Sequence, residues 1–196
     1  MTYAGGINSG CGVIFEWDPV TNIYIKKFSF DHSYSGSHPY GSLTINEGKF
    51  YGMTSTGGVN SQGVIFEWDP ASNIFIKKIE LVNVSMGANP KGSLTFFNSK
   101  FYGMTEAGGS YQYGVIFEWD PATNIYVKKM DFDWSNGAMP KGSFTLKDGK
   151  LYGMTAGGGN YFLGVIFEWN PINNVIVKKI DFDGTFKGSS PYGDLT

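Results

Sequence analysis

Acidic side chains recur at fixed intervals along this 196-residue chain, and they are the first candidates for chemistry. One glutamate stands at the same place in each of four repeats, so the four copies could bind a cation if they lined a channel. A carboxylate in the middle of a strand must otherwise be exposed or paired. We favour salt bridges to lysines such as Lys26-Lys27 and Lys77-Lys78. The recurring glutamates are Glu16, Glu67, Glu118 and Glu168.

The other acidic and basic groups give weaker indications of chemistry. Asp131 and Asp133, like Asp181 and Asp183, have the alternate spacing found in calcium loops, but the full Asp-x-Asp-x-Asp-Gly pattern ending in glutamate is absent from the sequence. We expect these carboxylates to cap turns. The two histidines, His32 and His38, occur only in the first repeat, and we expect surface roles for them. No nucleophile stands near a histidine and an acid in a repeated motif. The sequence therefore predicts no catalytic residue, metal site or cofactor.

The aromatic residues divide into those that recur with the repeat and those that do not. The recurring tryptophans are expected to be buried for packing, since truncating a buried tryptophan costs about 3–5 kcal/mol. They are Trp17, Trp68, Trp119 and Trp169. The varied aromatics fall in predicted loops, where a rigid scaffold commonly binds ligands. The candidate ligand-binding residues are Tyr34, His38, Tyr40, Tyr111, Tyr113, Trp134, Tyr161 and Phe162. The alternative is that these rings pack against one another at the junctions between repeats.

The phrase Gly-Val-Ile-Phe-Glu-Trp-Asp-Pro sets the period of the chain. It begins at Gly12, Gly63 and Gly114, and at Gly164 with asparagine for aspartate, so the spacings are 51, 51 and 50 residues. A period near 50 is that of a four-stranded propeller blade. We therefore divide one domain, residues 1–196, into repeats at about 1–52, 53–103, 104–153 and 154–196.

Four strands are predicted in one repeat, at residues 42–45, 49–54, 64–68 and 74–79. Short glycine-bearing and proline-started connections join the first pair and the last pair, which indicates antiparallel pairing. Glycine or proline interrupts the chain about every ten residues, and no helical periodicity appears. The expected fold is an all-β propeller of four four-stranded antiparallel blades, either a closed ring or an arc of a larger propeller. A sandwich or a solenoid is the alternative.

Strand direction predicts where the loops emerge. The second-to-third and fourth-to-first connections should lie on one face of the disc, and the hairpin turns on the other. The repeats differ mainly on the first face, where the candidate aromatics stand. The small-residue first strand should line the axis, with the glutamate-bearing third strand farther out.

Composition excludes several functions. The chain has 15 lysines, no arginine and a formal charge of -2, which argues against nucleic acid as a partner. Cys11 is the single cysteine, so no intramolecular disulfide can form and a buried, inert thiol is expected. No apolar run approaches the ~18–20 residues that span a bilayer.

The two ends of the sequence meet within one repeat. Met1-Thr2 aligns with Met53-Thr54, and Gly193-Asp194-Leu195-Thr196 aligns with Gly41-Ser42-Leu43-Thr44. About eight residues are missing between them, including most of a second strand. We expect either an incomplete closing blade or, as the favoured interpretation, an arc of a longer array whose open blade edges could form a homo-oligomer.

The repeats resemble two known families. Pro90-Lys91-Gly92-Ser93-Leu94-Thr95, Lys100-Phe101-Tyr102, Gly108-Gly109 and the Phe117-Glu118-Trp119-Asp120-Pro121 stretch are similar to a kelch repeat, with a later glycine pair. A closer resemblance is to the bacterial GloVer-type tandem repeat. It is carried by Pro39-Tyr40-Gly41-Ser42-Leu43, by Leu151-Tyr152-Gly153-Met154-Thr155, with methionine for a threonine, and by Gly157-Gly158. The resemblance implies an exported or surface-attached bacterial protein with no catalytic residues.

These observations predict a non-enzymatic extracellular binding or adhesion module that engages a glycan or a protein through its loop-rich face. One alternative is a polysaccharide lyase or hydrolase with its site at the propeller mouth. The other is a structural protein that assembles with itself.

Overall fold

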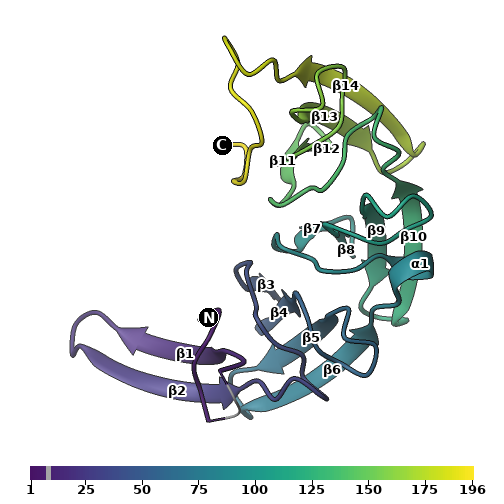
Figure 1. Ribbon diagram of the computed structural model, residues 1–196. Helices are drawn as coiled ribbons and strands as arrows, with labels where there is room; N and C mark the ends of the chain where they lie inside the picture. Colours follow the sequence, from purple (N-terminus) through teal and green to yellow (C-terminus); the bar gives the residue numbers. More distant parts are fainter. Residues whose placement is uncertain (8–9) are drawn as a thin grey trace.

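The computed structural model describes residues 1–7 and 10–196, and antiparallel β-sheets dominate it. The sheets follow one another around an open arc (Figure 1). Three of them have four strands each, and the N-terminal sheet has two among the described residues. The predicted all-β blade architecture is confirmed, and the arc is the arrangement observed.

The strands of the second repeat lie within two residues of the predicted ranges. The N-terminal sheet contains β1 (Val13–Asp18) and β2 (Ile23–Ser29). The three complete blades are β3 (Thr44–Asn46), β4 (Lys49–Thr54), β5 (Val64–Asp69) and β6 (Ile74–Glu80), then β7 (Thr95–Phe97), β8 (Lys100–Met104), β9 (Val115–Asp120) and β10 (Ile125–Asp131), then β11 (Thr145–Lys147), β12 (Lys150–Thr155), β13 (Val165–Asn170) and β14 (Val175–Asp181). One short helix, α1 (Asn83–Met86), was not predicted and lies between β6 and β7.

The shortest strand of each blade lies on the inner side of the arc, as predicted (Figure 1). Consecutive inner segments come so close that a Cβ at Gly41 would clash with the carbonyl oxygen of Gly92. The same relation joins Gly92 to Gly142 and Gly142 to Gly193. Glycine is therefore required by backbone packing around the axis.

A β-bulge recurs where the outer two strands of each sheet pair. In the second sheet Ile65 pairs with Ile79 and Phe66 pairs with Lys77, so Lys78 is the extra residue. The other sheets shift register at the equivalent place. Because a bulge changes the direction in which side chains point, the two lysines of the Lys-Lys pair in each four-stranded sheet reach different carboxylates. Lys77 contacts Glu80, whereas Lys78 contacts Glu67.

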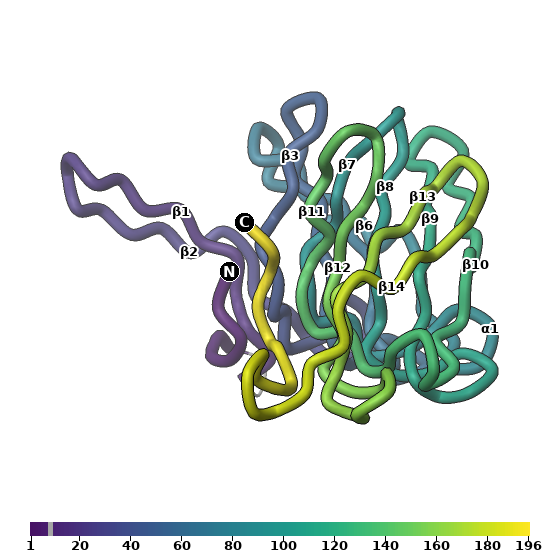
Figure 2. Tube along the Cα trace, turned by 90° about the horizontal axis from the view of Figure 1, so that it is seen from above, coloured from purple at the N-terminus to yellow at the C-terminus, as the bar shows by residue number. Residues whose placement is uncertain are grey.

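Each hydrophobic cluster lies between two successive sheets. Trp68, Trp119 and Trp169 are buried as predicted, and Trp119 stacks on Phe101 of the neighbouring strand at 5.3 Å. The prediction for Trp17 was wrong, because its side chain is 53% exposed. Its sheet has two strands and projects from the other blades in Figure 2, so no third strand covers the indole.

An asparagine in the outer hairpin of each four-stranded blade connects it to the preceding blade. Asn124 accepts a hydrogen bond from Trp119 Nε1 at 3.2 Å and donates to the carbonyl of Lys78 in the preceding blade at 3.1 Å. Asn73 and Asn174 make the same pair of bonds. The side chain therefore joins the recurring tryptophan to the bulge of the neighbouring sheet.

Candidate functional site

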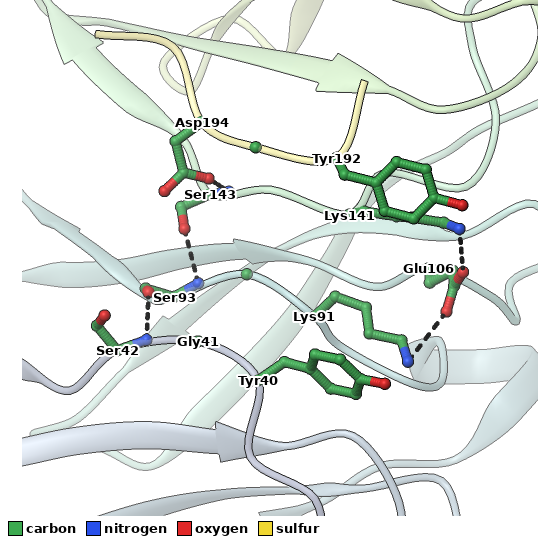
Figure 3. Close-up of a pocket in the computed structure, with 12 residues that line it drawn as sticks. Tyr40, Gly41, Ser42, Lys91, Ser93, Glu106, Lys141, Ser143, Tyr192 and Asp194 are labelled. Carbon is green, nitrogen blue, oxygen red and sulfur yellow. Dashed lines mark hydrogen bonds and ion pairs between the residues drawn. The ribbon is translucent and has the colours of Figure 1, made fainter. Parts of the chain in front are cut away.

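A pocket of about 410 Å³ lies at the inner rim of the arc, and one short motif builds its wall. In each repeat a proline precedes the first strand, and the residue after it faces the pocket (Figure 3). These residues are Tyr40, Lys91, Lys141 and Tyr192. The pocket is thus formed jointly by successive repeats at the loop-rich end of the axis.

Two lysines in the wall are held over two tyrosine rings. Lys91 Nζ lies 3.8 Å from the ring centroid of Tyr40, and Lys141 Nζ lies 4.1 Å from that of Tyr192. A cation over an aromatic face is attracted by about 0.5–2 kcal/mol. Hydrogen bonds to Tyr192 and then Glu106 raise the pKa of Lys141, although partial burial opposes them.

Glu106 lies between the two lysines. Its Oε2 is 3.6 Å from Lys91 Nζ, and its Oε1 is 3.2 Å from Lys141 Nζ. The residue stands in the loop after β8, which brings it toward the pair (Figure 3). Five side chains therefore form one chain of contacts across the pocket, from Tyr40 through Lys91, Glu106 and Lys141 to Tyr192.

The opposite wall is a ladder of serines. The backbone N–H of Ser42 donates to Ser93 Oγ at 2.8 Å, and that of Ser93 donates to Ser143 Oγ at 2.8 Å. The N–H of Ser143 donates to the Asp194 carboxylate. Each serine oxygen that accepts one of these bonds retains its own hydrogen for a further partner.

Two of the predicted ligand-binding residues, His38 and Tyr40, lie beside this pocket. The ring of Tyr3 packs on His38 at 4.6 Å and on Tyr40 at 4.7 Å. A hydrogen bond with Tyr40 raises the pKa of Tyr3. Of these three, Tyr40 lines the pocket directly.

Hydroxyl groups connect the two histidines. His32 Nδ1 lies 3.0 Å from Ser37 Oγ, which lies 2.9 Å from Thr56 Oγ1, and Thr56 Oγ1 lies 2.9 Å from His38 Nδ1. Ser37 is fully buried. The predicted surface role therefore describes His38 incompletely, because its ring belongs to an internal hydrogen-bond chain.

The other predicted aromatics form a separate group on the loop-rich face. Tyr113 packs against Trp134 at 4.8 Å, and Phe162 lies 6.3 Å from Trp134. Tyr111 and Tyr161 are exposed, as is Phe162. Tyr34 instead packs toward Phe75, with Lys77 Nζ 4.9 Å above its ring. Some of these rings therefore pack together, whereas others face solvent, and ligand binding by the exposed rings stays a prediction.

The recurring glutamates pair with lysines, as favoured from the sequence. Glu67, Glu118 and Glu168 are buried, and each contacts a lysine at the start of the second strand and the bulged lysine. Hydrogen bonds from Lys150 and Lys179 lower the pKa of Glu168 to about 2. Burial opposes a similar lowering of the pKa of Glu118, but the lysine contacts outweigh it. Glu16 pairs with Lys27 while 60% of its side chain is exposed.

Two of the four Asp-Phe-Asp carboxylates, Asp133 and Asp183, cap their own turns, as expected, whereas Asp131 and Asp181 bond a loop 21 residues earlier in the chain. Asp133 accepts the backbone N–H of Asn136 at 3.0 Å, and Asp183 accepts that of Phe186 at 2.9 Å. Asp131 accepts the N–H of Ser110, and Asp181 accepts that of Asn160. Each of these carboxylates therefore holds a loop in place.

Sequence reasoning missed most of the pocket. Lys91 and Lys141 occupy a position that recurs in every repeat, although the sequence shows that the residue after proline is tyrosine in two copies and lysine in the other two. Glu106 aligns with Ser55 and Ala156, so it is the charged departure from the repeat at that position. A comparison of the copies one position at a time would have found it.

The radial sheets define a propeller-like repeat protein, and known structures agree. The chain is similar to the extracellular domain of a hybrid two-component system from B. thetaiotaomicron, with TM-score 0.61 and 13% identity over 94% of this chain and 22% of that one. TolB from Acinetobacter baumannii gives TM-score 0.56 and 11% identity, covering 85% and 37%. A chain of the nidogen/laminin complex gives 0.55 and 13%, covering 81% and 52%. The chain thus spans about half or less of these proteins.

The chain belongs to the Gloeobacter/Verrucomicrobia repeat family, whose model matches residues 77–196. This confirms the GloVer resemblance. No curated protein sequence matches the chain. Within the part that the structure describes, no helix has the length and hydropathy needed to span a bilayer.

Proposed function

We propose that the protein is an extracellular, non-enzymatic binding module that takes its ligand, a glycan or a protein segment, into the inner-rim pocket. The observation that carries the proposal is the convergence of Tyr40, Lys91, Glu106, Lys141 and Tyr192 from successive repeats on one concavity. Its volume is within the usual range of ligand pockets, about 300–1,000 Å³. An extracellular location is supported by the extracellular domain among the similar structures.

The bonding of the acidic groups supports binding over catalysis. Both carboxylate oxygens of Glu106 contact lysine ammonium groups, and Asp194 accepts a backbone N–H. A general acid or base needs a proton position directed at its substrate. In this arrangement the carboxylates instead position the neighbouring groups.

The test is a glycan array and a protein pull-down with the wild type and three variants. Tyr192→Ala removes a tyrosine of the pocket that is 68% exposed, and Tyr111→Ala removes a tyrosine of the loop-rich face that is 58% exposed. Tyr24→Ala, on β2, is the matched control. We expect loss of binding for Tyr192→Ala alone.

Three outcomes would contradict the proposal. If Tyr111→Ala abolishes binding and Tyr192→Ala leaves it intact, the ligand binds at the exposed aromatics of the loop-rich face and not in the pocket. No ligand in either screen would count against a binding module. In a separate activity assay on any polysaccharide that binds, turnover that a fourth variant, Glu106→Gln, abolishes would establish the enzyme alternative.

A further inference from the structure

We propose that the inner-rim pocket binds an acidic saccharide, whose carboxylate lies between Lys91 and Lys141 in place of Glu106. This rests on the proposed function above and names the ligand class for the same pocket. Glu106 then acts as an internal competitor that occupies the anion position in the free protein.

The two ammonium groups are already placed for one carboxylate. Lys91 and Lys141 come from successive repeats, and each is held over a tyrosine ring at 3.8 and 4.1 Å. Both converge on the two oxygens of a single carboxylate. Little ordering of these long side chains is left for the ligand to impose, which favours affinity. The pair is therefore a formed anion-binding position.

Glu106 is held loosely by comparison with the structural glutamates. Its contacts to the two lysines are 3.6 and 3.2 Å, whereas Lys150 and Lys179 lie 2.7 and 2.8 Å from Glu168. Charge-assisted hydrogen bonds to a carboxylate are usually about 2.7–2.9 Å. A carboxylate that can approach both lysines more closely would gain interaction energy over Glu106.

The repeat architecture does not require Glu106. The aligned positions in the other two four-stranded blades hold Ser55 and Ala156, so blades of the same fold form with quite different side chains there. Its side chain is 21% exposed, which leaves it room to move toward solvent. Replacement by a ligand would therefore leave the sheets intact.

The remaining lining fits a sugar acid better than a protein surface. Ser93 and Ser143 present hydroxyls along one wall, and Tyr40 and Tyr192 present phenols along the other. A polyhydroxylated ring can use donors and acceptors on both sides. A concavity of about 410 Å³ falls in the range of pockets that take small ligands, about 300–1,000 Å³, whereas a stable protein interface is a broad surface of about 800 Å² on each partner. The chemistry indicated is a uronic acid unit of a glycan.

Isothermal titration calorimetry with tetragalacturonate, cellotetraose as its neutral counterpart and tetraglutamate as an acidic peptide tests the proposal. We expect the wild type to bind tetragalacturonate in preference to both other probes. Lys91→Met and Lys141→Met should each weaken this binding about tenfold, whereas Lys26→Met on β2 should not change it. Glu106→Gln should strengthen it about fivefold, because the competing charge is gone. Thermal unfolding of each variant checks that the fold is retained.

Several results would overturn the inference. If Glu106→Gln weakens binding or leaves it unchanged, Glu106 is not a competitor. If cellotetraose binds equally well, the ligand carboxylate does not contribute to recognition, although the pocket still binds a saccharide. Preference for tetraglutamate would identify an acidic peptide as the ligand. If tetragalacturonate binds neither the wild type nor any folded variant, the proposal of an acidic saccharide ligand is wrong. The glycan array and the pull-down then test separately whether the protein is a binding module at all.

Discussion

Glu118 and Glu16 stand in the same phrase but in different surroundings. Glu118 contacts Lys100 and Lys129 with 10% of its side chain exposed, whereas Glu16 contacts one lysine with 60% exposed. Removing one partner of a buried charge pair leaves the other charges uncompensated, while exposed pairs contribute about 0–1 kcal/mol. The local sequence is the same, so burial decides the difference.

We therefore expect Glu118→Gln to lower the free energy of unfolding by about 2 kcal/mol, because hydrogen-bonded charge pairs of this kind contribute about 1.5–3 kcal/mol. Glu16→Gln should change it by less than about 0.5 kcal/mol. Urea unfolding followed by tryptophan fluorescence measures both. Equal effects of the two substitutions would show that the lysine contacts do not stabilise the complete blades.

The inner segments depend on glycine at the close approach between successive blades. A Cβ at Gly92 would clash with the carbonyl of Gly142, whereas a Cβ at Gly193 has open space and an unstrained φ. Gly92→Ala should lower the melting temperature, with a cost of about 1–3 kcal/mol typical of overpacking, and should distort the pocket. Gly193→Ala is the matched control at the same repeat position. Calorimetry that finds the two variants alike would rule out the contact as the cause.

The strands were predictable because each repeat carries its own turn residues and its own alternation. Residues 49–54 were placed correctly from Gly48 and the apolar pattern alone. The bulge at Lys78 was not predicted, because a residue is extra only relative to the pairing with its partner strand, and that pairing is not visible in the local sequence. The pocket was missed for a related reason. Lys91 and Glu106 meet through the packing of neighbouring blades, and no local pattern records that packing.

The strands at the N-terminal end of the arc are less buried than those of the central blades. The sheet of β1 and β2 leaves Trp17, Tyr24 and Ile25 exposed, whereas β5 and β9 are buried between neighbours. Two-stranded sheets are marginally stable in water, and segments with few buried contacts unfold locally more often than the core. Hydrogen exchange should therefore be faster by at least about tenfold in β1 and β2 than in β5 and β9. Uniform protection would mean that the N-terminal sheet is covered in solution.

Acid should lower the stability of the folded protein, because the buried glutamate–lysine pairs recur in all three four-stranded blades. Lysine contacts lower the pKa of Glu67, Glu118 and Glu168 against the opposing effect of burial, and that of Glu168 reaches about 2 from an ordinary value of 4.5. A lowered folded-state pKa contributes stability above the unfolded value and loses it as the pH falls through the folded value. The urea midpoint should be steady above about pH 4.5 and fall toward pH 2. A midpoint unchanged down to pH 3 would contradict this assignment.

The hydroxyl chain between His32 and His38 has a proton-counting consequence. Three links join His32 Nδ1, Ser37 Oγ, Thr56 Oγ1 and His38 Nδ1, but the two hydroxyls carry only two hydrogens. At least one imidazole must therefore supply an Nδ1–H. If one ring is in the tautomer without a hydrogen on Nδ1, the other ring must carry a hydrogen on its Nδ1. The tautomers of the two histidines are therefore not independent. The tautomer of His38, which packs on Tyr3 beside the pocket, is therefore linked to the tautomer of His32 in the same loop.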